Sequence, residues 1–226
     1  MEQVLSYLEQ NKERYLAELK DFLAIPSVST NPENKPDMQQ CAQWVADQMS
    51  GIGLNNVQVM PTPGHSVVYG DWLNAPGKPT VLLYGHYDVQ PPEPLELWTS
   101  PPFEATIRGE KLFARGSADD KGQVYIHLKS IEAFLKNVGS LPVNIKLLIE
   151  GEEEIGSEHL VPFVTEHKEM LKADLVLISD SSMFAKGVPS ICYALRGLAY
   201  MQIDLVGPNK DLHSGSFGGS VHNPIQ

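Results

Sequence analysis

Apolar residues near the start of the chain repeat at intervals of three and four, which is the spacing of one face of a helix. One repeat stops before Pro26 and the other stops before Gly53, and both residue types commonly follow a helix end. We therefore expect two amphipathic helices in this region. The residues that carry the repeats are Val4, Leu8, Tyr15, Leu19 and Phe22, then Met38, Cys41, Val45, Met49 and Ile52.

Short apolar runs separated by proline and glycine follow, and these runs predict β-strands. Two stretches with helical spacing lie between the later runs. Strands that alternate with helices are typical of an α/β fold with a layered sheet. The predicted strands are residues 57–60, 66–69, 80–84, 105–107, 111–113, 143–149 and 175–178, and the predicted helices are residues 122–135 and 157–167.

Residues that can bind metals stand directly after several of these strands. His86 follows one predicted strand, and Asp180 follows another. Glu153 and Glu154 lie just past a third. Because ligands of open α/β sheets gather beyond the carboxyl ends of the strands, we expect these side chains to share one edge. One histidine with several carboxylates suits a pair of divalent metal ions better than it suits other common chemistry.

Each of these candidates also has a plain structural explanation. His86 could be a strand-end histidine that Asp88 caps, and the local pattern favours neither this nor metal binding. Asp119 and Asp120 stand before a predicted helix, where capping by itself is the better explanation. The acidic run at residues 152–154 would usually be a solvated surface. Carboxylates crowded at one sheet edge repel each other unless cations compensate, so the residues taken together favour a metal site.

The pattern changes beyond the last predicted strand of the sheet. Residues 193–195 and 199–206 have the alternation typical of strands, which predicts the beginning of a second module. We therefore expect an α/β catalytic domain in residues 1–186 and a different domain in residues 187–226.

Composition narrows the possible functions. The chain has 226 residues, of which 42% are hydrophobic and 20% are charged, and this is enough for a packed core. Its formal net charge of -11 argues against a nucleic-acid partner, because phosphate contacts need clustered Lys and Arg. A glycine-rich stretch at residues 215–219 lacks the lysine of a phosphate-binding loop, and the chain has no Gly-x-Ser-x-Gly nucleophile pattern.

Cysteine usage and the absence of targeting patterns predict a cytoplasmic protein. Cys41 and Cys192 are far apart and form no CxxC pair, which indicates a reducing compartment. The first residues form a charged amphipathic segment rather than a signal peptide. Apolar runs stay well short of the roughly 20 residues of a membrane span, so we expect no membrane partner.

Several short motifs occur in order along most of the chain. They are GHYDVQP from Gly85, Trp98 with Pro102-Phe103, RGSADDKG from Arg115, EGEEEIGS from Glu150, Ser179-Asp180, and DLHSGSFGG from Asp211. In this order they resemble the co-catalytic zinc peptidases and deacylases, a family that includes acetylornithine deacetylase, succinyl-diaminopimelate desuccinylase, carboxypeptidase G and the carnosinases. The EEIGS and DLHSG forms are most similar to the carnosinase-type dipeptidase branch.

The resemblance implies a three-layer α/β/α catalytic domain, incomplete in this chain, followed by the start of an inserted α+β lid or dimerisation domain. It also implies two divalent metal ions, zinc above all, with manganese or cobalt as alternatives. One ion would bind His86 and Asp180, and the other would bind Glu154. Asp119 would bridge both ions, and the peptide bond between it and Asp120 would be cis.

Three further roles are implied by the same resemblance. Glu153 would be the general base, and Asp88 would orient His86. His213 would contact substrate in the active site of a partner subunit, which implies a homodimer. The implied activity is hydrolysis of the amide bond in dipeptides or short peptides. An N-acyl amino acid deacylase with the same metal centre and a non-catalytic fragment are the alternatives.

One ligand of the family pattern has no counterpart in this sequence. The second metal ion of the family needs a histidine from the far C-terminal part of the catalytic domain. Because Asn223 and Pro224 are typical of a helix start, we expect the chain to be the first part of a longer protein. By itself it is expected to bind one metal ion tightly, to show negligible dipeptidase activity and to be poorly soluble or oligomeric. The histidines in no matching motif are His65, His127, His159, His167 and His222.

Overall fold

The computed structural model describes residues 1–224, and the chain divides into two compact units, Met1–Ser182 and residues 183 onwards. The first unit contains a mixed sheet whose strands in spatial order are β1 (Asn55–Met60), β2 (Val67–Trp72), β6 (Asn144–Glu150), β3 (Thr80–His86) and β7 (Leu175–Ile178). β3 pairs in parallel with both β6 and β7. β2 pairs antiparallel with β6 and with β1.

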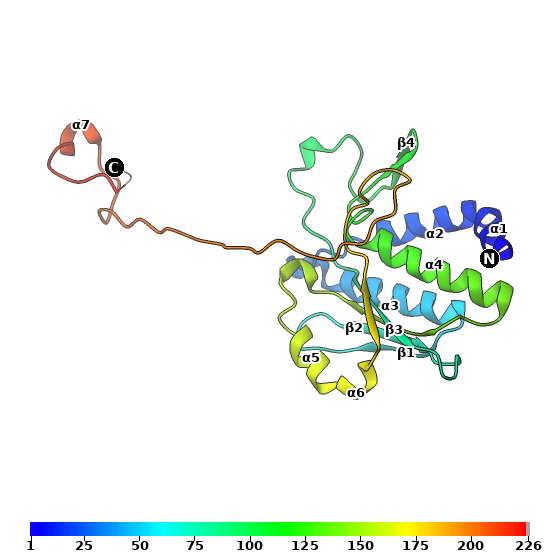
Figure 1. The fold of residues 1–226 in the computed structure, drawn as a ribbon. Helices are drawn as coiled ribbons and strands as arrows, with labels where there is room; N and C mark the ends of the chain where they lie inside the picture. The colour runs from blue at the N-terminus through cyan, green and yellow to red at the C-terminus, as the bar shows by residue number, and fades with distance from the viewer. Residues whose placement is uncertain (225–226) are drawn as a thin grey trace. The chain divides into compact units, whose positions relative to one another are not determined.

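Helices cover both faces of this sheet, which makes the three layers of the α/β/α fold (Figure 1). The alternation of side chains along β2 and β3 divides the core. Val68 and Leu83 pack towards one layer, whereas Val67 and Leu82 pack towards the other. The larger layer contains α1 (Glu2–Gln10), α2 (Lys12–Ala24), α3 (Lys35–Ile52) and α4 (Lys121–Val138), and the smaller contains α5 (Leu160–Glu166) and α6 (Lys168–Leu171).

Two of the long helices end where glycine permits it. Gly53 follows α3 with φ of +101°, and Gly139 follows α4 with φ of +74°. These left-handed conformations cost glycine little and terminate the helix hydrogen-bond ladder. The helix end predicted at Gly53 is confirmed, whereas α4 continues past the predicted end at residue 135 to Val138.

The first apolar repeat does not form one helix, contrary to expectation. The chain breaks at Asn11, whose amide donates to the backbone carbonyl of Tyr7 at 2.9 Å. An asparagine side chain that bonds to nearby backbone competes with the helical ladder, so α1 and α2 are separate helices. Both still turn apolar side chains inward, including Val4 and Phe22, which are buried.

Short elements connect the layers of the first unit. A hairpin of β4 (Thr106–Arg108) and β5 (Lys111–Phe113) forms where the sequence predicts one. Every helix within residues 1–224 is too short or too polar to span a bilayer. The 3₁₀ helices are η1 (Pro32–Asn34), η2 (Leu95–Leu97) and η3 (Glu153–Ile155).

The second unit differs from the sequence expectation. Residues 193–195 and 199–206 were predicted as strands, but they are extended chain without strand pairing in the described part of the unit. Tyr200 and Val206 are 86% and 93% exposed, so the alternation has no partner strand and no core to pack against. The unit contains one short helix, α7 (Ser214–Phe217), within residues 183–224. The helix expected after Pro224 lies outside the described residues.

Candidate metal centre

The predicted site residues of the first unit gather at one edge of the sheet. Because β3, β6 and β7 are parallel, their carboxyl ends meet there. His86 is the last residue of β3 and pairs with Glu150, the last residue of β6. Asp180 follows β7, and Glu153 lies in η3 just beyond β6.

His86, Asp119 and Asp180 form a cluster whose ligand atoms all lie within 4.8 Å of one another. The Nε2 atom of His86 is 3.1 Å from a carboxylate oxygen of Asp119 and 3.6 Å from one of Asp180. One imidazole nitrogen and two carboxylate oxygens are donors that zinc, manganese and cobalt all accept. The residue types and their convergence therefore fit a divalent metal ion.

Asp88 fixes the imidazole ring from behind. The Nδ1 atom of His86 lies 3.2 Å from the Asp88 carboxylate and 3.1 Å from the Asp88 backbone carbonyl, and both side chains are fully buried. The same carboxylate accepts hydrogen bonds from the backbone N–H groups of Glu153 and Glu154 at 3.3 and 3.1 Å. Asp88 thus joins the histidine to the turn that carries both glutamates, an arrangement typical of residues behind a metal ligand.

The two glutamates of η3 point to different partners. A carboxylate oxygen of Glu153 lies 3.9 Å from His86 Nε2. Glu154 instead accepts a hydrogen bond of 2.7 Å from the side-chain amide of Gln90. The structure therefore brings His86, Asp119 and Asp180 together, with Glu153 beside them, whereas Glu154 lies outside that cluster of donor atoms.

The carboxylates at this edge have raised pKa values. Burial raises the pKa of Asp180, Glu153 and Glu154, and negative charges on neighbouring carboxylates raise each of them further. The positive charge of a protonated His86 acts in the opposite direction but does not cancel these effects. These carboxylates therefore carry more negative charge than the neighbouring His86 side chain neutralises.

His86 responds to the same crowding. Burial would lower its pKa, but the carboxylates of Asp88, Asp120 and Asp180 outweigh burial and raise the pKa to about 10. A histidine must lose its proton before it can bind a metal, so metal and proton compete for this ring.

Asp119 and Asp120 meet through a cis peptide bond, as the family resemblance implies. Asp120 turns inward, where it is buried, and one of its carboxylate oxygens accepts the backbone N–H of His86 at 3.1 Å. Burial is the main cause that raises the pKa of Asp120 to about 7. The sequence around Asp120 favours a helix cap, whereas its contact with β3 is a long-range one that has no local signal.

Two supporting residues were not singled out from the sequence. Gln90 belongs to the GHYDVQP motif, so that motif is the signal that could have found it. Glu150 is buried at the end of β6, where its carboxylate accepts hydrogen bonds from the hydroxyls of Tyr84 and Ser157. Its burial depends on contacts with β3 and with Ser157, which the acidic residues that follow Glu150 in the sequence do not reveal. Both residues restrain the chain that leads into η3.

His213, the remaining predicted site residue, belongs to the second unit. It is exposed, and its Nδ1 atom accepts the backbone N–H of Gly215 at 3.1 Å, which caps α7. The described contacts of His213 are therefore local.

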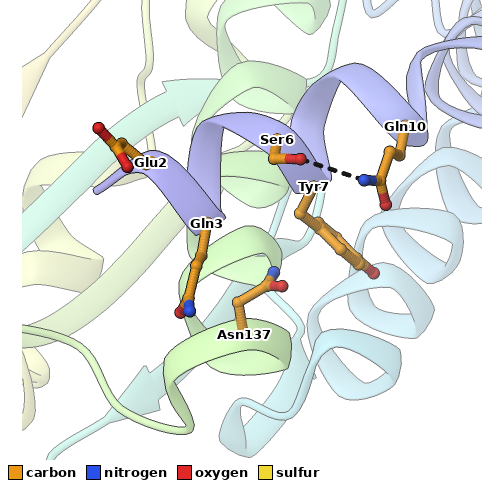
Figure 2. A pocket seen from close by; sticks show the side chains of 6 residues that line it. All are labelled: Glu2, Gln3, Ser6, Tyr7, Gln10 and Asn137. Carbon is orange, nitrogen blue, oxygen red and sulfur yellow. Dashed lines mark hydrogen bonds between the residues drawn. The ribbon is translucent and has the colours of Figure 1, made fainter.

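A polar pocket of about 340 Å³ lies elsewhere in the first unit, between α1 and the end of α4 (Figure 2). Glu2 is its one carboxylate, and a hydrogen bond joins Gln10 to Ser6 on its wall. This lining offers no cluster of metal donors. Within residues 1–224, the cluster of side chains that could hold a metal ion therefore lies at the sheet edge and not in this pocket.

The arrangement described above defines an α/β protein with a candidate divalent-metal centre at the carboxyl edge of its sheet. The sequence profile described as Peptidase family M20/M25/M40 matches residues 82–208, and the chain belongs to this family. The resemblance inferred from the motifs is thereby confirmed.

Two similar sequences come from proteins that are named dipeptidases. The chain is 34% identical to the Cys-Gly metallodipeptidase dug1 of Schizosaccharomyces pombe, over 100% of the chain and 50% of that protein. It is 32% identical to the Beta-Ala-His dipeptidase of Homo sapiens, over 100% of the chain and 47% of that protein. The chain thus spans about half the length of the curated relatives it matches.

Solved structures agree with this relationship. Human carnosine dipeptidase 1 superimposes with a TM-score of 0.76 at 28% identity, over 99% of the chain and 50% of that structure. The dipeptidase Dug1p of Saccharomyces cerevisiae superimposes with a TM-score of 0.75 at 27% identity, again over 99% and 50%. The carnosinase-type branch indicated by the motifs is therefore the one that these comparisons support.

Proposed function

We propose that this protein hydrolyses the amide bond of dipeptides or short peptides, with two divalent metal ions, zinc above all, as its cofactors. The observation that carries the proposal is the His86, Asp119 and Asp180 cluster, located at the carboxyl edge of the sheet in a member of a peptidase family. The printed names of its relatives support the dipeptide as substrate class.

His86 and Asp180 would hold one ion, Glu154 would hold the other, and Asp119 would bridge the two. When bound, the ions polarise the scissile carbonyl and lower the pKa of a water molecule. The surplus of carboxylates over cationic side chains at this edge supports the assignment, because two dications would compensate it.

Glu153 is the residue we assign as general base. It is half-buried beside His86 and it has a raised pKa, so its carboxylate can accept a proton from the attacking water and return it to the leaving amine. Its backbone N–H is held by Asp88, which keeps the side chain at this position. Asp88 itself would hold the His86 ring in the orientation that exposes Nε2.

The second unit is assigned to the beginning of a lid or dimerisation domain. This proposal follows the family resemblance of the DLHSGSFGG motif rather than any contact in the structure. In a cytoplasmic homodimer, His213 would reach the substrate bound by the other subunit.

An assay of the full-length protein tests the proposal. Cys-Gly, β-alanyl-histidine and an N-acetylated amino acid would be offered after chelation, and then after readdition of zinc, manganese or cobalt. We expect hydrolysis of at least one dipeptide, its loss with the chelator and its return with two metal ions per chain. Cleavage of the N-acylated amino acid alone would support the deacylase instead, and metal-independent hydrolysis would contradict the proposed centre.

A further inference from the structure

Lys121 is a fully buried lysine that directly follows Asp119 and Asp120 in the chain. Its ammonium group donates to the backbone carbonyls of Phe22 and Ile25 at 3.1 and 2.7 Å, and it lies 5.0 Å from the centre of the Phe22 ring. These carbonyls belong to the end of α2, where the helix dipole favours a positive charge. The side chain thus connects the first turn of α4 to the last turn of α2.

Burial of this charge is expensive in the absence of a carboxylate partner at hydrogen-bond distance. Transfer of an ammonium group out of water is costly even after the protein relaxes around it. An apolar side chain of similar length, such as methionine, would fill the same space without this cost. A role beyond packing would explain why the position holds a lysine.

The segment that Lys121 anchors carries the bridging carboxylate. Asp119 and Asp120 directly precede Lys121, and the N–H of Gly122 closes the loop on the carbonyl of Gly116 at 3.3 Å. A Cβ at Gly116 would lie 3.3 Å from the Lys121 side chain. The loop is therefore packed around this side chain, and the direction of the Asp119 carboxylate depends on where the loop is held.

The end of α2 holds the histidine side of the site as well. The hydroxyl of Ser27 donates to the backbone carbonyl of Tyr87 at 2.7 Å, and the N–H of Val89 donates to the carbonyl of Ser27 at 2.9 Å. Tyr87 stands between His86 and Asp88. One short segment, residues 25–27, therefore contacts both the chain that carries the histidine and the lysine that follows the bridging aspartate.

We propose that Lys121 is a positioning residue that sets the distance between Asp119 and His86 by anchoring the 116–122 loop to the end of α2. The inference rests on the proposed metal centre and deepens it. Lys121 does not touch substrate or metal in this role. Its effect is to keep two ligands, which come from different parts of the chain, at a separation that one ion can bridge.

Lys146 offers a matched control for a purely structural role. It is also a buried lysine, 8% exposed, and its ammonium group donates to the backbone carbonyls of Met170 and Lys172 at 2.5 and 2.7 Å. These carbonyls lie at the end of α6, so the chemistry of the contact is the same. The carbonyls that Lys146 holds precede β7 at its amino end, which is the end opposite to the one that Asp180 follows.

The experiment compares Lys121→Met with Lys146→Met in the full-length protein. The metal dissociation constant is measured on the metal-free protein by competition with a chromophoric chelator, and urea unfolding is followed in parallel. We expect both variants to lose stability, whereas Lys121→Met alone weakens metal binding by about 10-fold or more. Lys121→Arg, which retains a cation for the same carbonyls, should recover most of that affinity.

Two outcomes would overturn the proposal. One is unchanged metal affinity in Lys121→Met, and the other is an equal loss of affinity in Lys146→Met. Failure of the unmodified protein to bind zinc would instead refute the metal centre itself, so the two failures are distinguishable.

A measurement on the unmodified protein covers the case in which Lys121→Met does not fold. Hydrogen exchange is recorded with and without zinc. We expect zinc to slow exchange at Gly122 and also at Ser27 and Val28, because Lys121 couples the loop to the end of α2. Protection of Gly122 without any change at Ser27 and Val28 would overturn the proposal.

Discussion

Two groups of ionisable side chains occur in the first unit, and their glutamates have opposite pKa shifts. We call Arg14, Glu18, Lys129 and Glu132 the helix cluster, and His86, Asp119, Glu153, Glu154 and Asp180 the metal-centre cluster. In the helix cluster the pKa values of both glutamates are lowered. In the metal-centre cluster the pKa values of Glu153, Glu154 and Asp180 are raised.

The helix cluster contains its own compensating charges. Lys129 lies 2.6 Å from Glu18 and 3.0 Å from Glu132, while Arg14 bonds to both glutamates. Burial acts to raise the pKa of each glutamate, but the hydrogen bonds from Arg14 and Lys129 outweigh it. Two cations thus balance two carboxylates, and the cluster joins α2 to α4.

The metal-centre cluster lacks this balance. His86 is the one basic side chain among its four carboxylates, and it is the group that must become neutral to bind a metal. This imbalance distinguishes a binding site from a structural group of charges. Charges that the protein itself pairs stabilise the fold, whereas a surplus of one sign at a sheet edge is complementary to a ligand of the other sign.

The largest expected effect concerns the proposed base. Glu153→Gln in the full-length protein should lower kcat by about 10²–10⁴-fold, because the amide cannot accept the proton, while metal content is retained. Steady-state kinetics and metal analysis measure the two quantities. Glu158→Gln, at an exposed position five residues further along, is the control and should leave both unchanged. Loss of one metal ion, with kcat restored by excess zinc, would exchange the roles of Glu153 and Glu154.

A smaller effect is expected behind the histidine. Asp88→Asn should weaken metal binding by about 10–100-fold, because the amide no longer fixes the His86 ring by charge. Asp71→Asn is the matched control: Asp71 is 5% exposed and is hydrogen-bonded to Tyr69 and Asn56, away from the proposed ligands. Chelator competition compares the two variants. Equal affinities would show that the Asp88 contact does not support the site.

A substitution in the helix cluster should lower the stability of the protein and leave its metal affinity unchanged. Glu132→Gln is expected to lower the free energy of unfolding by about 1–3 kcal/mol at pH 7, because Arg14 and Lys129 lose a charged acceptor. Urea unfolding gives this quantity. The zinc dissociation constant of the same variant should match that of the unmodified protein. A weakened zinc affinity would mean that the two clusters are coupled and that the comparison fails.

The smallest effect is a pH dependence of opposite sign in the two clusters. The folded-state pKa values of Glu18 and Glu132 lie below their usual value of 4.5, so their contribution to stability is present above that pH and is lost as the pH falls through the folded-state values. In the metal-centre cluster the carboxylates have raised pKa values, so their contribution to the stability of the metal-free protein increases as the pH falls. The free energy of unfolding, measured with urea between pH 7 and pH 3, should therefore fall less steeply in Glu132→Gln than in the unmodified protein. An identical slope in both proteins would contradict the lowered pKa values.

Local chemistry explains which features could be predicted from the sequence. The ends of α3 and α4 follow from Gly53 and Gly139, and the strands of the sheet follow from short apolar runs. Because parallel strands direct their carboxyl ends to one edge, the sequence alone predicts that His86 and Asp180 lie near each other.

Long-range contacts decided the rest. Arg14 meets Glu132 across 118 positions of sequence, and Lys121 meets Phe22 across 99, so neither pair has a local signal. The alternation in residues 199–206 resembles that of a real strand, yet a strand also needs a neighbour for its hydrogen bonds. The sequence by itself determined the family, the layers and the edge at which the chemistry lies. The tertiary structure decided which charges are paired and which remain to bind a ligand, because pairing depends on distance in space and not on order along the chain.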